Sequence, residues 1–222
     1  LSRKLAHEIK NPLTPIQLTI DRIRDKYANK ISSEDQINFK ENLKIINNQI
    51  KQIENLVNEF SDFARMPKPI FKKNNLIKIL EENIKLLSEI DEKISINLKV
   101  SKSSIFLNCD KEQIARVFFN LIKNSIESIQ QKAEKNPNFN KKISIEINED
   151  NDHIKISLID NGIGFNNLDN NINEILSPYF TTKKNGTGLG LSIVNKIVND
   201  HNGELSFFSI VDGAKIEINF LK

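Results

Sequence analysis

The sequence predicts an α plus α/β protein in which an antiparallel helical hairpin is followed by a two-layer α/β sandwich. The distribution of glycine is the first observation behind this prediction, because all seven glycines lie at or beyond Gly162. Glycine-free sequence with regular apolar spacing favours long helices, whereas clustered glycine favours loops built around a ligand. The second observation is apolar periodicity, which has helical steps in residues 39–64 and strand-like alternation in residues 143–159.

Composition excludes several classes of protein. Of the 222 residues, 38% are hydrophobic and 27% are charged, which is enough apolar sequence for a folded core. The 32 Lys and Arg against 29 Asp and Glu leave a net charge of +3, so we expect no nucleic-acid partner. The single cysteine, Cys109, excludes a disulfide framework and a cysteine zinc site. No run reaches the ~18 apolar residues that span a bilayer. Because the chain starts at Leu1 and not at Met, we expect a fragment whose membrane segments lie upstream.

The first two helices are predicted from their apolar seams. Steps of three and four residues repeat along each helix, as at the a and d positions of a supercoiled helix. Ser32 or Ser33 is expected to cap the second helix, with Asp35 or Gln36 supporting its first turn. A lone hairpin leaves much of its apolar face bare, so we expect a homodimer in the form of a four-helix bundle. The seam residues are Leu5, Ile9, Leu13, Ile16, Ile20, Ile23 and Tyr27 in the first helix, and Phe39, Leu43, Ile46, Ile50, Ile53, Val57, Phe60 and Ala64 in the second.

Pro67 and Pro69 mark the expected domain boundary, because proline cannot continue a helix. We therefore assign residues 1–66 to the hairpin, 67–73 to a linker and 74–222 to the second domain. In that domain, helices are expected near residues 76–90, 110–131 and 187–201, and strands near 94–100, 105–108, 143–148, 153–159, 204–210 and 214–221.

His7 lies on the first predicted helix, opposite the apolar seam, with Glu8 beside it and Asn11 one turn later. An exposed histidine on a helix is usually a plain surface residue. A His-Glu-x-x-His zinc site is excluded, because Asn11 stands where the second histidine would be. Pro12 and Pro15 follow inside the helix, and each is expected to loosen or bend it. Two prolines inside a helix reduce its stability, so this pattern indicates a role other than packing.

Asn120 and Asn124 lie four residues apart, on one face of the helix predicted for residues 110–131. Asparagine is mildly unfavourable within a helix, so two of them in register are weak evidence on their own. A neutral amide oxygen nevertheless suits Mg²⁺, which keeps several waters and takes most of its charge partners from substrate phosphates.

Two glycine motifs follow. Residues 160–164 (Asp-Asn-Gly-Ile-Gly) end an apolar strand; they form either a plain turn or a site where the carboxylate accepts a hydrogen bond from a base amine. In the second interpretation the glycines let the base approach the backbone. Residues 186–190 (Gly-Thr-Gly-Leu-Gly) open a predicted helix and free N–H groups for an anion, but match neither the Walker A loop nor the dinucleotide fingerprint. The Tyr179-Phe180 pair just upstream is either a core anchor or part of a lid.

These motifs together resemble those of a known family. Residues 7–13, 120–124, 160–164, 178–183 and 186–191 are similar to the H, N, G1, F and G2 boxes of sensor histidine kinases, in the family's order. The longer string from His7 to Leu18 resembles the nitrogen-regulation sensor kinases of the NtrY type. The resemblance implies a dimerisation and histidine phosphotransfer hairpin, followed by a catalytic ATP-binding sandwich of the GHKL (Bergerat) type.

The resemblance also implies roles for individual residues. His7 would take the γ-phosphoryl group of ATP through a ring nitrogen, since an imidazole that titrates near pH ~6.5 is largely neutral in the cytosol. Glu8 would hydrogen-bond the other nitrogen, and Asn11 would position water for a phosphatase reaction on the partner. Asn124 would hold Mg²⁺, and Asp160 would read the adenine amine. The remaining ATP-binding residues would be Asn120, Lys123, Gly162, Gly164, Tyr179, Phe180, Thr182, Lys183, Lys184, Gly186, Thr187, Gly188, Leu189 and Gly190.

The family further implies partners and a location. The phosphoryl group would pass to an aspartate of a response-regulator receiver domain, for which an NtrX-like regulator is the candidate. We expect the regulator to dock near residues 22–27, on the helix below His7. The chain would be a cytoplasmic domain of a protein in the bacterial inner membrane, attached only through segments upstream of this fragment.

Two other classes remain open from the sequence. One is a dimeric pseudokinase that uses nucleotide only to set its conformation, although the intact motifs argue against it. The other is a chaperone-type or mismatch-repair-type ATPase of the same fold, in which a catalytic Glu precedes the magnesium Asn by one turn. Here that position is Asn120, which cannot act as a base for water, so phosphoryl transfer to a protein is favoured. Asp212-Gly213-Ala214 replaces the Gly-Gly-Thr-like turn of many relatives, so no hydroxyl contact to the base is expected there.

Overall fold

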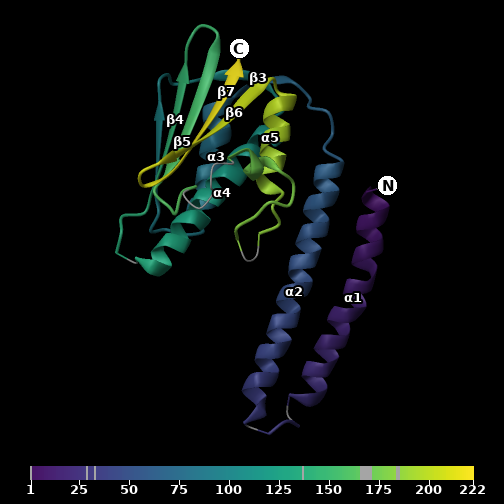
Figure 1. The fold of residues 1–222 in the computed structure, drawn as a ribbon. Coiled ribbons are helices and arrows are strands. Elements are labelled where there is room, and N and C mark those ends of the chain that lie inside the picture. The colour runs from purple at the N-terminus through teal and green to yellow at the C-terminus, as the bar shows by residue number, and fades with distance from the viewer. Residues whose placement is uncertain (1, 29, 33, 137, 166–171, 184–185) are drawn as a thin grey trace. The chain divides into compact units, whose positions relative to one another are not determined.

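The computed structural model describes residues 2–28, 30–32, 34–136, 138–165, 172–183 and 186–222, with the side chains of residues 2–7, 172 and 173 outside that description (Figure 1). The chain divides into two compact units. One contains Leu1–Pro67 together with Thr181–Leu189, and the other contains Lys68–Phe180 together with Gly190–Lys222. Each unit is described separately below.

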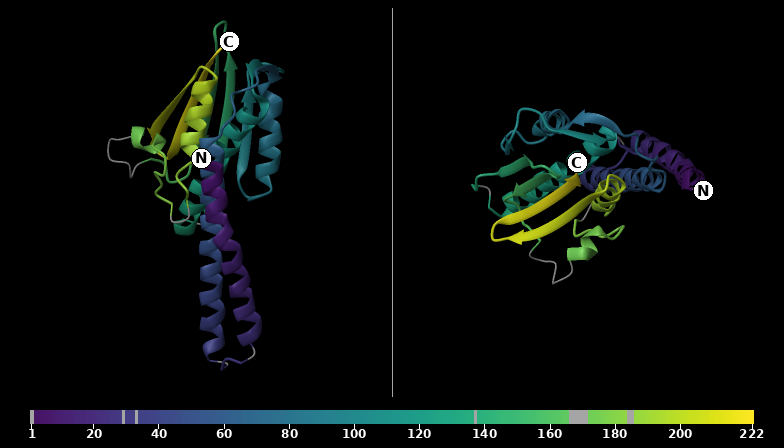
Figure 2. Two further views of the ribbon diagram at one scale, coloured as in Figure 1. Left: turned by 90° about the vertical axis from the view of Figure 1, so that its right-hand side faces the viewer. Right: turned by 90° about the horizontal axis from the view of Figure 1, so that it is seen from above.

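The first unit is built on two long helices, α1 (Ser2–Tyr27) and α2 (Asp35–Ala64), which run side by side (Figure 2). Leu13 and Ile20 of α1 pack against Leu43 and Ile50 of α2, with Phe39 beside this cluster. α1 continues through Pro12 and Pro15 without ending. Part of the reason is local, since a proline interrupts hydrogen bonding only toward the preceding turn.

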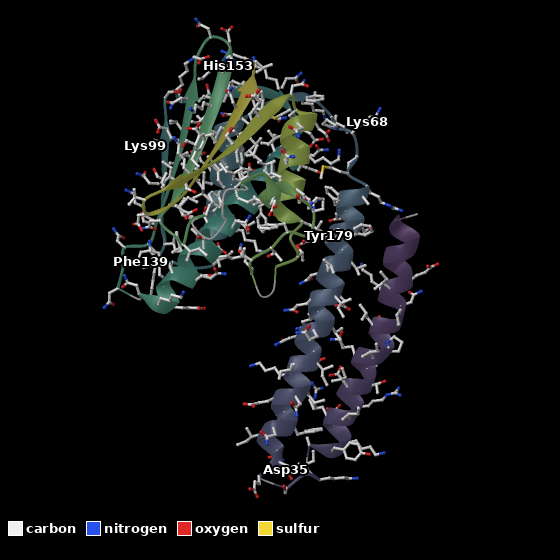
Figure 3. All side chains as sticks on the ribbon, viewed as in Figure 1. Asp35, Lys68, Lys99, Phe139, His153 and Tyr179 are labelled. Atoms are coloured by element: carbon white, nitrogen blue, oxygen red, sulfur yellow. The ribbon has the colours of Figure 1, made fainter. Side chains whose placement is uncertain are left out.

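Ser32 organises the connection between the two helices, although Glu34, whose side chain makes no capping hydrogen bond, is the residue that directly precedes α2. The Ser32 hydroxyl accepts a hydrogen bond from the Asp35 N–H at 3.3 Å and donates to the Asp35 carboxylate at 2.7 Å. The Gln36 side chain donates to the Ala28 carbonyl at 2.6 Å, which ties the end of α1 to the start of α2. Asp35 is labelled at this end of the hairpin in Figure 3. Ser33, the alternative cap, lies outside the described residues.

The second unit is a two-layer sandwich, with helices on one face of a five-stranded sheet (Figure 1). The strand order is β2-β4-β5-β7-β6, and every neighbouring pair is antiparallel except β2 with β4. The strands are β2 (Ser95–Val100), β4 (Lys142–Glu149), β5 (His153–Asp160), β6 (Gly203–Ile210) and β7 (Gly213–Leu221). The helices are α3 (Leu76–Ser88), α4 (Lys111–Lys135) and α5 (Gly190–Asp200), and a short 3-10 helix, η1, covers Ile172–Leu176.

The apolar alternation of the strands fills the space between sheet and helices. Ile143, Ile145 and Ile147 of β4 are buried, as are Ile216 and Ile218 of β7. The helices supply the opposite side, and the fully buried residues of α4 include Ile114, Ile122 and Ile129. The mixed sheet and its helical layer confirm the two-layer α/β sandwich predicted from the sequence.

Three boundaries differ from the sequence prediction. A strand β1 (Lys72–Asn75) begins inside the expected linker and pairs antiparallel with β3 (Phe106–Cys109), where Asn74 also donates to the Cys109 carbonyl at 2.8 Å. α4 runs on to Lys135 and ends just before Pro137, past the predicted end near residue 131. α5 begins at Gly190 rather than at Thr187, because the glycines that precede it adopt loop conformations, with Gly188 at φ +70°.

Candidate functional site

Asp160 is the last residue of β5 and one of the few charged side chains that this fold buries, with 3% of its surface exposed. Its Oδ1 accepts the Gly162 N–H at 2.9 Å, and its Oδ2 accepts the Ser125 hydroxyl at 2.9 Å. Burial raises the pKa of Asp160, although the hydrogen bonds from Gly162, Ser125 and Ala214 oppose that shift. A buried carboxylate held by several donors is a strong, fixed acceptor for a ligand donor.

The glycines after Asp160 are required by packing within the domain. A Cβ on Gly162 would lie 2.2 Å from the Ser128 hydroxyl oxygen and 2.8 Å from its backbone carbon. Gly164 has φ +69°, and a Cβ there would lie 2.4 Å from the carbonyl oxygen of Gly213. In one interpretation of the sequence, these glycines let a base approach the backbone. The structure adds that they let α4 and the β6–β7 turn approach this loop.

Asn120 and Asn124 are half-buried and share one face of α4, as their spacing predicts. The amide oxygen of Asn120 would lie 3.7 Å from a Cβ on Gly190, so the first turn of α5 meets α4 at this residue. Lys123 is exposed on the adjacent face, with its ammonium 3.9 Å from Glu127 and 6.0 Å from the centre of the Phe119 ring. The structure therefore brings the Asn120 amide to the N-terminus of α5.

The segment Thr181–Leu189 belongs to the first unit. Within it the Thr181 hydroxyl accepts the Lys183 N–H at 3.1 Å, and a Cβ on Gly186 would lie 2.4 Å from that hydroxyl oxygen. The Thr187 hydroxyl donates to the Glu59 carboxylate of α2, and Leu189 is buried. Thr182 is exposed, and Lys184 lies outside the described residues.

Tyr179 has a backbone conformation that is unusual for a residue other than glycine, with φ +71°. It occupies a turn in which the Phe180 N–H donates to the Ser177 carbonyl at 3.2 Å, and 55% of its surface is exposed. Figure 3 labels it in the loop that leads toward α5. An exposed aromatic residue in a left-handed conformation is an observation that favours a functional loop over a core anchor.

The H-box residues lie near the N-terminal end of α1. The backbone of His7 is helical, whereas its side chain lies outside the described residues. Glu8 and Asn11 are exposed on α1, which fits the prediction of a solvent-facing motif. Leu13, two residues after Asn11, is buried against α2 and fixes the rotation of the helix at this point.

Sequence reasoning missed three side chains that build the Asp160 loop. The Ser125 hydroxyl of α4 donates to the Asp160 carboxylate, and the Ser128 hydroxyl of α4 accepts the Ile163 N–H at 3.0 Å. Lys132, also on α4, donates to the Asn161 carbonyl at 2.8 Å and pairs with Asp212 of the β6–β7 turn. Ser125 had a signal in the sequence, because it is a hydroxyl at a position in the apolar rhythm of α4 where a hydrophobic residue is expected.

In the described ranges, no group of three or more His, Cys, Asp or Glu side chains is arranged to hold a metal ion. No helix in the same ranges has the length and apolarity needed to cross a membrane.

Comparison with known proteins identifies two families of domain. The family described as His Kinase A (phospho-acceptor) domain matches residues 1–69, and the family described as Histidine kinase-, DNA gyrase B-, and HSP90-like ATPase matches residues 109–222. The second match covers the sandwich from Cys109 onward and agrees with the GHKL type expected from the motifs.

Similar proteins align with almost the whole of this chain. A putative NtrY-like sensor histidine kinase of Rickettsia conorii is 34% identical over 221 residues, which are 99% of this chain and 35% of the relative. The nitrogen regulation protein NtrY of Azorhizobium caulinodans is 32% identical over 213 residues, which are 96% of this chain and 27% of that protein. This chain thus spans about a third of the length of these relatives.

A solved structure of the histidine kinase ThkA in complex with the response regulator protein TrrA superposes with a TM-score of 0.67. Its sequence identity is 25%, and the alignment covers 99% of this chain and 60% of that chain. The catalytic domain of ThkA alone gives a TM-score of 0.60 at 27% identity, covering 69% of this chain and 96% of that chain. With a phospho-acceptor domain followed by an ATPase domain, this chain belongs to the histidine kinase-, DNA gyrase B- and HSP90-like ATPase family, and it is similar along almost its whole length to NtrY-like sensor histidine kinases.

Proposed function

We propose that this chain is a catalytic core that binds ATP, phosphorylates itself on His7 and passes the phosphoryl group to an aspartate of a response regulator. The observation that supports this most directly is the buried, multiply hydrogen-bonded carboxylate of Asp160 at the end of β5. Such an acceptor suits the exocyclic amine of adenine, and it lies in an ATPase domain that follows a phospho-acceptor domain.

In this proposal, one set of residues contacts the adenine base of ATP and another set contacts its phosphates. Asp160 accepts the adenine amine, and Gly162 and Gly164 shape the loop around the base. Asn120, Lys123 and the N-terminus of α5 at Gly190 face the phosphates, where helical N–H groups favour anions. Thr182, Lys183, Lys184 and the loop Gly186, Thr187, Gly188 and Leu189 supply further phosphate contacts, with Tyr179 and Phe180 at the entrance to this loop.

The residues present fit Mg²⁺ as a companion of ATP. Asn124 offers a neutral amide oxygen on the face that it shares with Asn120, and the described residues contain no carboxylate cluster that would bind a metal by itself. This donor set suits an ion that receives most of its negative charge from a phosphate chain. When bound, the ion would neutralise charge on the phosphates, and Asn124 would hold it there.

Phosphoryl transfer then requires a neutral imidazole. A ring nitrogen of His7 forms a bond to the γ-phosphorus as the bond to the bridging oxygen breaks and ADP leaves. Glu8 hydrogen-bonds the other ring nitrogen and disperses the positive charge that develops on the ring. In the second step the phosphorus passes from the His7 nitrogen to a carboxylate oxygen of the regulator, and the imidazole returns to its neutral form.

The hairpin is proposed to act as a homodimer. Ile9, Ile16 and Ile23 of α1 are 36%, 46% and 37% exposed, although they belong to the predicted seam. Ile46 and Ile53 of α2 are likewise 44% and 41% exposed. A row of partly exposed isoleucines along two helices suits burial against a second copy in a four-helix bundle.

Three finer parts of the proposal rest on the resemblance and on the names of relatives. Asn11 is exposed one turn after His7, where it would orient water for dephosphorylation of the regulator. The regulator would be NtrX-like and would dock near residues 22–27 of α1. The complete protein would lie in the bacterial inner membrane, with this chain on the cytoplasmic side.

The test is incubation of the chain with Mg²⁺ and γ-labelled ATP. We expect an acid-labile, alkali-stable label, and we expect His7→Gln to remove it completely while leaving ATP binding intact. His153→Gln is the matched control, because His153 is a surface residue of β5 remote in sequence from the H box. A label that persists in His7→Gln would show that the phosphoacceptor is another residue.

A further inference from the structure

Ser125 is a polar residue in an apolar environment. It lies on the buried face of α4 among Leu121, Ile122, Ile126 and Ile129, and only 2% of its surface is exposed. A hydroxyl buried at such a position is destabilising unless it is hydrogen-bonded. Its partner is Asp160, whose Oδ2 lies 2.9 Å from the Ser125 oxygen.

The number of hydrogen bonds to the Asp160 carboxylate determines how much acceptor capacity is left for a ligand. An ionised carboxylate has about four acceptor sites. In Asp160, three donors use such sites: the N–H groups of Gly162 and Ala214 and the hydroxyl of Ser125. The two N–H groups belong to the backbone of the loop and of β7, so Ser125 is the side chain that fixes the carboxylate. Acceptor capacity on the carboxylate oxygens therefore remains for a donor from a ligand.

We propose that Ser125 is a positioning residue for base recognition, which holds the Asp160 carboxylate in the orientation that accepts the exocyclic amine of a 6-aminopurine nucleotide. This inference rests on the proposed binding of ATP. It adds a residue next to Asn124 that touches Asp160 and acts through it, so that discrimination between 6-amino and 6-keto purines depends on two side chains.

The electrostatic setting gives the proposal a pH dependence. Burial already raises the pKa of Asp160, and the Ser125 hydroxyl is one of the donors that oppose this. Lys132 of α4 is the charged group that acts on Asp160, and it is itself paired with Asp212 of the β6–β7 turn. Loss of the Ser125 hydroxyl raises the pKa of Asp160 further. The protonated carboxyl loses acceptor capacity, so binding of a 6-aminopurine weakens most at low pH.

The experiment measures the affinities of ATP and of ITP, in which a 6-keto group replaces the amine, for the wild-type chain and for Ser125→Ala. We expect ATP affinity to fall about tenfold at pH 7 and by a larger factor at pH 5.5, because hydrogen bonds to charged groups have this strength. ITP affinity should change by less than about twofold, so the discrimination between the two nucleotides falls about tenfold.

Matched variants separate positioning from folding. Ser88→Ala removes a hydroxyl of α3 that donates to the Lys85 carbonyl of its own helix, and it should leave the ATP-to-ITP ratio unchanged. Ser125→Thr keeps the hydroxyl and should restore most of the ratio. Ser125→Cys keeps the volume with a weak donor, so it tests the inference even if Ser125→Ala fails to fold, and it should lower the ratio.

The outcomes distinguish this inference from the proposed function. Equal losses of ATP and ITP affinity in Ser125→Ala and Ser125→Cys would mean a structural role only, which overturns the inference while ATP binding stands. An unchanged ATP affinity in those variants would overturn it as well. A wild-type chain that binds no ATP would overturn the proposed function and, with it, the role of Ser125.

Discussion

The helical hairpin and the α/β sandwich both contain regular apolar patterns, but they bury them to different extents. In α2 the buried seam residues are Leu43, Ile50 and Val57, which recur every seventh position, while Ile46 and Ile53 between them remain more than 40% exposed. In the sandwich, the alternate residues of β4 and β7 are almost completely buried beneath α3, α4 and α5.

This difference shows what an apolar pattern determines and what it leaves to context. A strand's inward face is covered by helices of the same chain, so alternation converts directly into a closed core. The seam of α2 has two rows of apolar residues, and in this hairpin only the row of Leu43, Ile50 and Val57 is buried. The sandwich is therefore complete as a single copy, whereas the hairpin has the surface of half a bundle.

The largest expected effect is in the sandwich. Phe220 of β7 is fully buried, and its ring packs against Gly203 of β6, where an added Cβ would lie 2.7 Å from the ring. We expect Phe220→Ala to lower the free energy of unfolding of the sandwich by about 3–5 kcal/mol, independently of protein concentration. The measurement is urea unfolding of the whole chain, in which the unfolding transition of the sandwich is monitored.

The matched control is Phe208→Ala in β6. Phe208 is 42% exposed and contacts Lys215, whose ammonium lies 5.4 Å from the ring centre. Its replacement should change the free energy of unfolding by less than about 1 kcal/mol. If both variants had the same effect, burial would not explain the stability of this unit and the comparison with the hairpin would fail.

A smaller effect is expected in the hairpin, and it should depend on concentration. Ile46→Ala combined with Ile53→Ala removes apolar surface from four side chains of a dimer, which weakens association by about 2 kcal/mol, or roughly thirtyfold in the dissociation constant. Sedimentation equilibrium measures this constant. The free energy of unfolding of the sandwich should be unaffected.

Ile45→Ala is the control within the same helix. Ile45 is 57% exposed, more than either seam residue, but it lies about 200° around the helix from Leu43. Its replacement should leave the dissociation constant within about twofold. A larger effect of Ile45 than of the seam pair would place the dimer interface on another face of α2.

The sequence predicted the elements that depend on local signals and missed those that depend on distant partners. The buried row of each seam and the β4–β5 hairpin follow from periodicity and turn chemistry, and the structure confirms them. Strand β1 has the sequence Lys-Lys-Asn-Asn, which has low strand propensity, and it forms because β3 lies beside it. No local pattern specifies that pairing.

The candidate site divides in the same way. Its glycine and asparagine motifs were recognisable as residue types at fixed spacings, whereas the hydroxyls of Ser125 and Ser128 gain meaning only when α4 packs on the loop after β5. The packing of Gly162 against Ser128 shows the same point, because a close approach between two elements cannot be read from either one alone.

The smallest expected effect concerns the place where the chain leaves the hairpin and joins the sandwich. Asp110 caps α4, since its Oδ1 accepts the N–H groups of Glu112 and Gln113 at 3.0 and 3.1 Å, and its Oδ2 accepts the Ile70 N–H at 2.9 Å. Its own N–H donates to Nε2 of His201 at 3.0 Å. We expect Asp110→Ala to destabilise the sandwich by about 1 kcal/mol through loss of the cap, with the hairpin's self-association unchanged.

We expect the difference in stability between wild type and Asp110→Ala to disappear at low pH. Burial acts to raise the pKa of Asp110, but the three backbone N–H groups outweigh it and hold the pKa below its usual value of about 3.9. A carboxyl whose pKa is lower in the folded chain contributes stability above its unfolded pKa, and that contribution is lost as the pH falls through the folded pKa. Wild type and Asp110→Ala should therefore differ most in thermal unfolding above pH 5 and converge only as the pH falls below the lowered folded pKa. Asp110→Asn keeps an acceptor for the cap but cannot ionise, so it should retain part of the stability with no acid dependence from this position. If Asp110→Ala instead altered self-association of the hairpin, the sandwich and the hairpin would not be separable in the way their burial patterns indicate.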